Sequence, residues 1–361
     1  MTVNMKQLLV ELDREFQLGE NWEQVSDDAL SVLDESQPWF VRALVGFGAW
    51  IASILLLTFI FGLGMISDES AFIVIGIALI IGALLLRRFT ESDFSDQMSL
   101  ALSFAGQFAI AFGIAADSNE IKFFLWPLLI INSIMLFVFP SRTHRFLSVL
   151  FIVACIISLL YVYEQNALVC IVGPMLAVLL VIFADNEPAI VVRRWSSFLR
   201  PVMAAVMIAA FACLLLSTAY LLPQLKDEFT VYPRPWISSL ILGAVLLYVT
   251  GRIWVGLFGS VSAPGSIAGF LLTVALIAAA LPAPGLLLAL IVIALGAAQG
   301  SRFYVGAGIM FLAVFITTYF YGIETSMLTK SMTLAATGLV IVFSRWLLLI
   351  LRRREGDSGH A

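Results

Sequence analysis

The stretch ALVCIVGPMLAVLLVIFA, residues 167–184, runs for eighteen positions without a charged side chain. A helix of roughly 20 apolar residues has the length needed to cross the hydrocarbon core of a bilayer. A spanning segment must also satisfy its own backbone hydrogen bonds, which a helix does and an isolated strand does not. We therefore expect residues 167–184 to form a transmembrane helix.

The rest of the chain has the same character. Of its 361 residues, 61% are hydrophobic and only 12% are charged, with a mean hydropathy of +1.03, whereas soluble domains carry about 25% charged residues. The apolar runs are continuous rather than alternating, which excludes a transmembrane β-barrel. The sequence predicts an all-α, polytopic transmembrane helix bundle of about twelve spans. The other runs are 41–65, 71–86, 97–115, 123–139, 146–162, 201–222, 236–251, 266–281, 285–298, 303–321 and 331–351.

Three regions follow from this pattern. They are a cytoplasmic helical leader at 1–37, the transmembrane bundle at 38–351 and a cytoplasmic tail at 352–361. Leu8, Leu12 and Phe16 recur at helical spacing in the polar leader. A segment of this length cannot bury enough surface to fold alone. We expect it to dock on the bundle or on a partner.

The placement of basic residues predicts the orientation. With the N-terminus inside, sixteen of the twenty Lys and Arg residues fall on the cytoplasmic side, and the exceptions are Lys122, Lys226, Arg234 and Lys330. Cytoplasmic loops of membrane proteins carry such an excess of positive charge. Both ends of the chain are therefore expected in the cytoplasm.

Several classes of function are disfavoured by the residues present. No basic domain suited to nucleic acid occurs. Cys155, Cys170 and Cys213 all lie inside apolar runs and have no metal-ligand spacing. No nucleophile, base and acid converge, and no cofactor motif is found. We expect a protein without a catalytic site, a metal or a cofactor, whose main partner is the lipid bilayer.

One intramembrane polar site is predicted between the third and fourth spans. Gln107 and Asn132 lie at matching depth, about ten residues in from the outer ends of the two spans, and Ser103 is one helical turn from Gln107. Two interpretations stay open. The three residues line a small polar site, or they form an interhelical hydrogen bond that holds the bundle together, worth roughly 1 kcal/mol.

A proline interrupts the sixth span. Pro174, in the pair Gly173-Pro174, lacks an N–H and should free the carbonyl of Cys170 and kink the helix. Interrupted helices also form transporter sites, usually as corresponding pairs, and no matching partner segment is found. The spacing of Gly296 and Gly300 is typical of close helix packing.

Two predicted inner loops are basic. Contacts to anionic headgroups are predicted for Arg142, His144, Arg145, Arg193 and Arg194. The positive charge of cytoplasmic loops explains the same residues without any ligand.

The chain resembles the bacterial polytopic membrane family called domain of unknown function 4401, itself related to family 2157. The resemblance lies in Pro38-Trp39-Phe40-Val41-Arg42, in Gly46-Phe47-Gly48-Ala49-Trp50 and in a C-terminal stretch with Tyr321-Gly322, Leu328-Thr329-Lys330-Ser331, Gly338 and Arg345-Trp346. It implies a bacterial inner-membrane location and a small membrane-associated partner protein with a Gly-Asp-Tyr-type motif. It implies no activity.

The leading functional hypothesis is a non-enzymatic inner-membrane protein, acting as a transporter-like or envelope-assembly component. The alternative is a scaffold or accessory subunit of a membrane complex without transport activity. A membrane-embedded enzyme acting on a lipid-linked substrate is the third. A carrier needs a water-accessible cavity near Gln107 and Asn132. A scaffold needs a closed bundle with an exposed apolar groove or a docked leader helix.

Overall fold

The structure is a computed structural model that describes most of the residues between 69 and 322. The described residues are Gly48, Ile51, Leu55, Thr58, 69–89, 93–116, 118, 120–192, 196–218, 235–281, 283–322, Leu328, Ser331 and Met332. The leader at 1–37, the tail at 352–361 and nearly all of the runs 41–65 and 331–351 lie outside them. Those four predictions are therefore untested.

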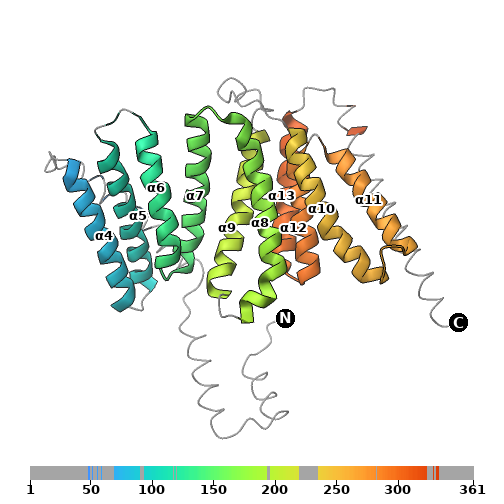
Figure 1. The fold of residues 1–361 in the computed structure, drawn as a ribbon, viewed down its shortest axis with the longest axis horizontal. Coiled ribbons are helices and arrows are strands. Elements are labelled where there is room, and N and C mark those ends of the chain that lie inside the picture. Colours follow the sequence, from blue (N-terminus) through green and yellow to red (C-terminus); the bar gives the residue numbers. More distant parts are fainter. Residues whose placement is uncertain are drawn as a thin grey trace, which may run out of the picture. The chain divides into compact units, whose positions relative to one another are not determined.

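The described part of the chain is helical and contains no strand (Figure 1). Its helices are α4 (Glu69–Phe89), α5 (Asp93–Ala115), α6 (Lys122–Val138), α7 (Arg142–Val162), α8 (Asn166–Val192), α9 (Ser196–Thr218), α10 (Pro235–Phe258), α11 (Pro264–Ala280), α12 (Pro284–Gln299) and α13 (Arg302–Gly322). Each overlaps one of the predicted runs from 71–86 to 303–321. The all-helical prediction is thus confirmed for this region.

The chain divides into two compact units, residues 1–68 with 75–106 and residues 69–74 with 107–361. In the first unit, Gly106 packs directly against the backbone of Gly76 and the side chain of Ile80, because it has no Cβ. Arg87 forms an ion pair with Asp96. These contacts join α4 and α5 into an antiparallel hairpin.

The helices of the second unit alternate in direction. Ser238 near the start of α10 bonds Cys170 near the start of α8, and Arg252 near the end of α10 pairs with Asp185 in the second half of α8. Gln299, the last residue of α12, bonds Ala184. Helices α8, α10 and α12 are therefore parallel, with α7, α9, α11 and α13 running the other way.

This alternation collects arginines at one end of the second unit, which we call the arginine end. It is the end where α7, α9 and α13 begin and where α8, α10 and α12 finish. The described arginines there are Arg142, Arg145, Arg200, Arg252 and Arg302. The opposite end carries Glu120, Lys122 and Glu164. The described arginines of this unit thus lie at one end, where Asp185 also lies and pairs with Arg252.

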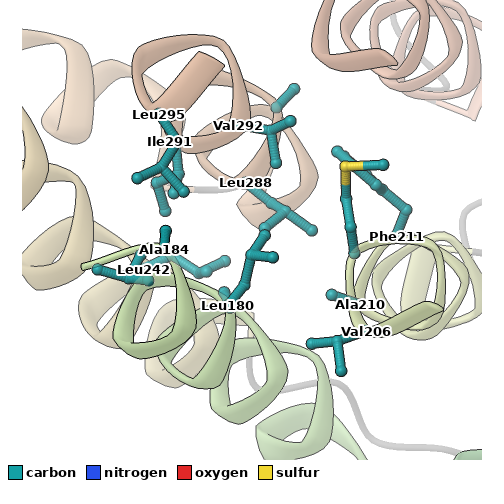
Figure 2. Packing of buried hydrophobic residues seen from close by; sticks show 14 of the residues in the cluster. Leu180, Ala184, Val206, Ala210, Phe211, Leu242, Leu288, Ile291, Val292 and Leu295 are labelled. Atoms are coloured by element: carbon teal, nitrogen blue, oxygen red, sulfur yellow. The ribbon is translucent and has the colours of Figure 1, made fainter. Parts of the chain in front are cut away.

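The large core of the second unit is apolar and centres on α12. Leu287, Leu288, Ile291 and Val292 of this helix are completely buried. Figure 2 shows Leu288 reaching between α8, which carries Leu180, and α9. A 16-residue helix is short for a span, but α12 lies inside the bundle, where its neighbours cover it.

Glycines allow two helix pairs to approach closely. A Cβ on Gly296 of α12 would lie 2.7 Å from the backbone nitrogen of Val305 in α13. A Cβ on Gly251 of α10 would lie 2.9 Å from the Phe270 ring of α11. The predicted close packing at Gly296 is confirmed. Gly300 instead ends α12 in the left-handed conformation, with φ of 68°.

Six of the described helices, α4, α5, α7, α8, α9 and α10, are long and apolar enough to cross a membrane. Helix α10 runs to Phe258, so the helix extends past the predicted run 236–251 and beyond Arg252. Side chains such as Val74, Leu240 and Leu271 are exposed, as lipid-facing positions are. The chain is a membrane protein by these criteria.

Candidate functional site

The predicted polar residues lie where α5, α6 and α7 meet, a site that we call the polar junction. It comprises Gln107 of α5, Asn132 of α6, and His144 and Ser148 of α7, all with 0% exposure. Helix α6 joins α7 through the short connection at 139–141, so that Asn132 and Ser148 are equally far from the turn. The three helices therefore bring these polar groups to similar depth.

His144 is the centre of the junction. Its Nδ1 lies 3.0 Å from Ser148 Oγ, and its Nε2 lies 3.4 Å from Gln107 Nε2. A neutral imidazole has one donor and one acceptor nitrogen. If the Gln107 amide N–H donates to Nε2, the ring proton is on Nδ1 and is donated to Ser148. One tautomer thus satisfies both contacts and links α5 to α7.

The His144 ring is also held from the side and through its backbone. It stacks on Phe139 with ring centroids 4.2 Å apart. Its backbone N–H donates to Ser141 Oγ at 3.5 Å, so Ser141 acts as the N-cap of α7. The sequence predicted a loop around His144, and that prediction was wrong, because the residue lies in the first turn of α7. The Ser141 cap starts α7 at Arg142 and turns the imidazole into the protein.

Among the described residues, the Asn132 amide has a hydrogen-bond partner for its nitrogen but none for its oxygen. Its Nδ2 donates to the carbonyl of Leu128, 2.9 Å away on the same helix. This bond fixes the orientation of the amide, because a flipped amide would place two oxygens together. Asn132 Oδ1 is buried and has no hydrogen-bond partner among the described residues. The contact between Gln107 and Asn132 stays a prediction.

The polar junction continues an apolar interface toward the arginine end. Ala111, Leu128 and Cys155 pack in one buried cluster of α5, α6 and α7. Gln107 lies one turn from Ala111, Asn132 one turn from Leu128, and Ser148 two turns from Cys155. The same three helix faces thus change from apolar to polar within one turn on α5 and α6 and within two turns on α7.

Ser103 lies on α5, one turn before Gln107, and is completely buried. Ser95 and Ser99 precede it at intervals of four residues and are buried as well. The sequence analysis singled out Ser103 alone. The structure adds that it belongs to a buried row of serines along one face of α5.

The predicted headgroup contacts differ in position. Arg142 is exposed at the start of α7, whereas the Arg145 guanidinium lies over the Phe198 ring at 5.2 Å. His144 is inside the protein. Arg193 and Arg194 lie outside the described residues. Of the predicted headgroup contacts that lie within the described residues, Arg142 and Arg145 thus keep accessible surface.

Further buried or partly buried polar residues, which the sequence pattern did not indicate, join neighbouring helices. Ser238 and Ser239 of α10 are buried, and their hydroxyls donate to the carbonyls of Cys170 at 2.7 Å and Leu281 at 2.6 Å. Gln299 donates to the carbonyl of Ala184. The predicted release of the Cys170 carbonyl by Pro174 was the signal available for the Ser238 contact.

The polar junction offers hydrogen-bond donors and acceptors in a dehydrated setting. Its side chains are two amides, an imidazole and a hydroxyl. Among the described residues, no three His, Cys, Asp or Glu side chains come together as a set that could hold a metal ion. These groups can form hydrogen bonds with one another and with a polar partner.

Comparison with known proteins gives a family. The family model described as "Domain of unknown function (DUF4401)" matches residues 38–351, which is most of the chain. No curated protein and no solved structure matches. The match covers every described helix and confirms the resemblance seen in the sequence: the chain belongs to the DUF4401 family, whose function is unknown.

Proposed function

We propose that this protein is a non-enzymatic structural subunit of the bacterial inner membrane, with twelve spans and both ends in the cytoplasm. In this proposal it acts as an envelope-assembly or scaffold component and binds a small membrane-associated partner. The bundle supplies a rigid, closed platform in the bilayer. The leader at 1–37 is the cytoplasmic element available for docking.

The closed polar junction is the observation that carries the scaffold proposal. Gln107, Asn132 and His144 have no exposed surface, and His144 is engaged at both ring nitrogens. A polar group inside a bilayer protein without a partner costs several kcal/mol. Side chains that satisfy one another across α5 and α7 favour a structural role over a solvated binding site.

The arginine end supports the proposed orientation. Arg142 and Arg302 are the first residues of α7 and α13, and Arg200 lies four residues after the start of α9. Cytoplasmic ends of spans carry such residues. The exposed Trp126 donates to Tyr163 Oη at 3.1 Å near the opposite end. Paired aromatic side chains of this kind favour the membrane–water interface.

A carrier is the second candidate, because Asn132 Oδ1 is an acceptor without a partner among the described residues. A carrier exposes its site to water from each side in turn. Cysteine accessibility separates the two candidates. In a background lacking the native cysteines, Ser148→Cys and Ser103→Cys are treated with a charged methanethiosulfonate reagent, applied to either membrane face.

The scaffold proposal expects neither cysteine to react while the protein is folded in membranes. Reaction of Ser148→Cys from both faces would refute the scaffold and establish the carrier. Arg142→Cys is the control, because its side chain is exposed and should react from the cytoplasmic face alone.

The same reagent tests the topology. Cysteines at Glu69, Asp117, Asp227 and Glu324 should react on intact spheroplasts. Cysteines at Arg88, Arg142 and Arg193 should react only after the membrane is opened. Reaction of the arginine set first would overturn the orientation and the twelve-span count.

A further inference from the structure

Helix α8 contains two prolines, Pro174 and Pro188, fourteen residues apart. At a rise of 1.5 Å per residue they are separated by about 21 Å along the helix axis. A proline has no N–H and leaves the carbonyl four residues earlier without its helical donor. The two carbonyls freed in this way belong to Cys170 and Ala184.

The carbonyl of Cys170 is taken by a neighbouring helix. Ser238 of α10 donates its hydroxyl to this oxygen at 2.7 Å, and both residues are buried. On another side of the same turn, Gly173 lies against α9, where an added Cβ would meet the Leu214 side chain at 3.0 Å. The proline turn is therefore held between α9 and α10.

The carbonyl of Ala184 is taken in the same manner by a different helix. Gln299, the last residue of α12, donates its amide N–H to this oxygen at 3.4 Å. The next residue, Asp185, accepts a hydrogen bond of 2.8 Å from Tyr248 and pairs with Arg252, both on α10. The second proline turn is thus held by α10 and α12.

Both clamps depend on a side chain that is distant in sequence. Ser238 is 68 residues from Cys170, and Gln299 is 115 residues from Ala184. A helix with a freed carbonyl bends where water or another group can satisfy that oxygen. Each clamp satisfies it from a neighbouring helix instead, and so ties the position of α8 to the packing of α10 and α12.

We propose that α8 is a two-hinge helix, held in place by Ser238 at the Pro174 hinge and by Gln299 with Arg252 at the Pro188 hinge. When the Ser238 clamp opens, residues 166–173 tilt away from α10 and the Cys170 thiol becomes accessible. The Pro188 hinge opens separately. This inference concerns motion within the bundle and does not depend on whether the protein is a scaffold or a carrier.

The native cysteines report on the hinge directly. Cys155 in α7 and Cys170 in α8 are both buried, and only Cys170 lies at a proline turn. The full-length protein in detergent is treated with N-ethylmaleimide, and the labelling rate of each cysteine is followed by peptide mass spectrometry. Ser238→Ala should speed the labelling of Cys170 by about tenfold and leave Cys155 unchanged.

Ser239 supplies a matched control. Its hydroxyl also donates to a carbonyl of another helix, that of Leu281 at the end of α11, in a partly buried hydrogen bond. Ser239→Ala should therefore leave Cys170 labelling at the wild-type rate. Gln299→Ala should do the same, because it opens the other hinge. Ser238→Thr keeps a hydroxyl and should stay close to wild type.

Restoring the missing donor gives the decisive variant. Pro174→Ala returns an N–H to the helix, so that the Cys170 carbonyl no longer needs Ser238. The double variant Ser238→Ala with Pro174→Ala should label at the wild-type rate, and Pro174→Ala alone no faster than wild type. These two variants test the hinge even if Ser238→Ala alone folds poorly.

Three results would overturn the proposal. One is an unchanged Cys170 rate in folded Ser238→Ala. Another is an equal acceleration at Cys155 and Cys170, which indicates loss of the whole fold rather than a hinge. The third is an acceleration in Ser238→Ala that Pro174→Ala does not reverse.

Discussion

The polar junction and the large apolar core are both closed to solvent, but different forces hold them. The junction has four polar side chains, and directional contacts join three of them, Gln107, His144 and Ser148. The core around α12 instead has leucine and isoleucine side chains together with phenylalanine rings, such as Phe211 stacked on Phe311 with ring centroids 3.5 Å apart. Lipid tails are as apolar as leucine, so burial itself gives helices little reason to associate in a bilayer. The core must therefore depend on close fit, and the junction on hydrogen bonds.

The largest effect is expected from a cavity in the core. Leu288→Ala removes a completely buried side chain of α12 and should cost about 2–5 kcal/mol, mostly through lost packing. Thermal unfolding in one detergent measures it. Leu271→Ala on the exposed face of α11 is the control and should change the midpoint little. Equal losses of stability in the two variants would show that close side-chain packing does not stabilise the core.

Overfilling the core should come next. Gly296→Ala places a Cβ 2.7 Å from the Val305 backbone nitrogen, so α12 and α13 must separate, at about 1–3 kcal/mol. Gly306→Ala is the matched control, because nothing lies within 4 Å of its added Cβ. A glycine scan by thermal unfolding compares the two. A Gly296→Ala variant that unfolds at the wild-type temperature would contradict the close approach of α12 and α13.

The junction should respond in a coupled way. His144→Phe and Gln107→Leu each remove the contact between α5 and α7, and each should cost about 1 kcal/mol. Because they remove the same contact, the double variant should lose less than the sum of the two. A double-mutant cycle measures this coupling. Strict additivity would mean that the two side chains do not support one another.

The smallest effect is expected at the arginine end. Asp185→Asn removes the ion pair with Arg252 but keeps an oxygen for the Tyr248 hydroxyl. Since Arg252 is largely exposed, the loss should stay below about 1 kcal/mol. Salt should lower the wild-type midpoint slightly and leave the variant unchanged. A large, salt-independent loss would assign Asp185 a different role.

The helices could be predicted from the sequence because an apolar run is a local signal. The runs from 71–86 to 303–321 correspond to the helices from α4 to α13, and the arginines of the second unit gather at one end. Charge and hydropathy are properties of each segment alone, so a helix can be predicted from them without knowing which segments pack against it.

The contacts between helices were harder to predict, because depth along a span does not say which neighbour a side chain faces. Gln107 was expected to meet Asn132 of the next helix, and its described partner is His144 on the helix after that. His144 itself was misplaced because the Ser141 cap was not recognised. The freed carbonyl of Cys170 was predicted, but its partner Ser238 is 68 residues away.

Helix α11 has a consequence for the membrane around it. Its 17 residues span about 26 Å, whereas a typical hydrocarbon layer is about 30 Å thick. Unlike α12, it exposes Ile267, Leu271 and Val274 on its outer side. Lipids in contact with this face must compress by a few ångströms to avoid hydrophobic mismatch, at a modest free-energy cost for each ångström. The protein should therefore concentrate in thinner regions of a bilayer of uneven thickness.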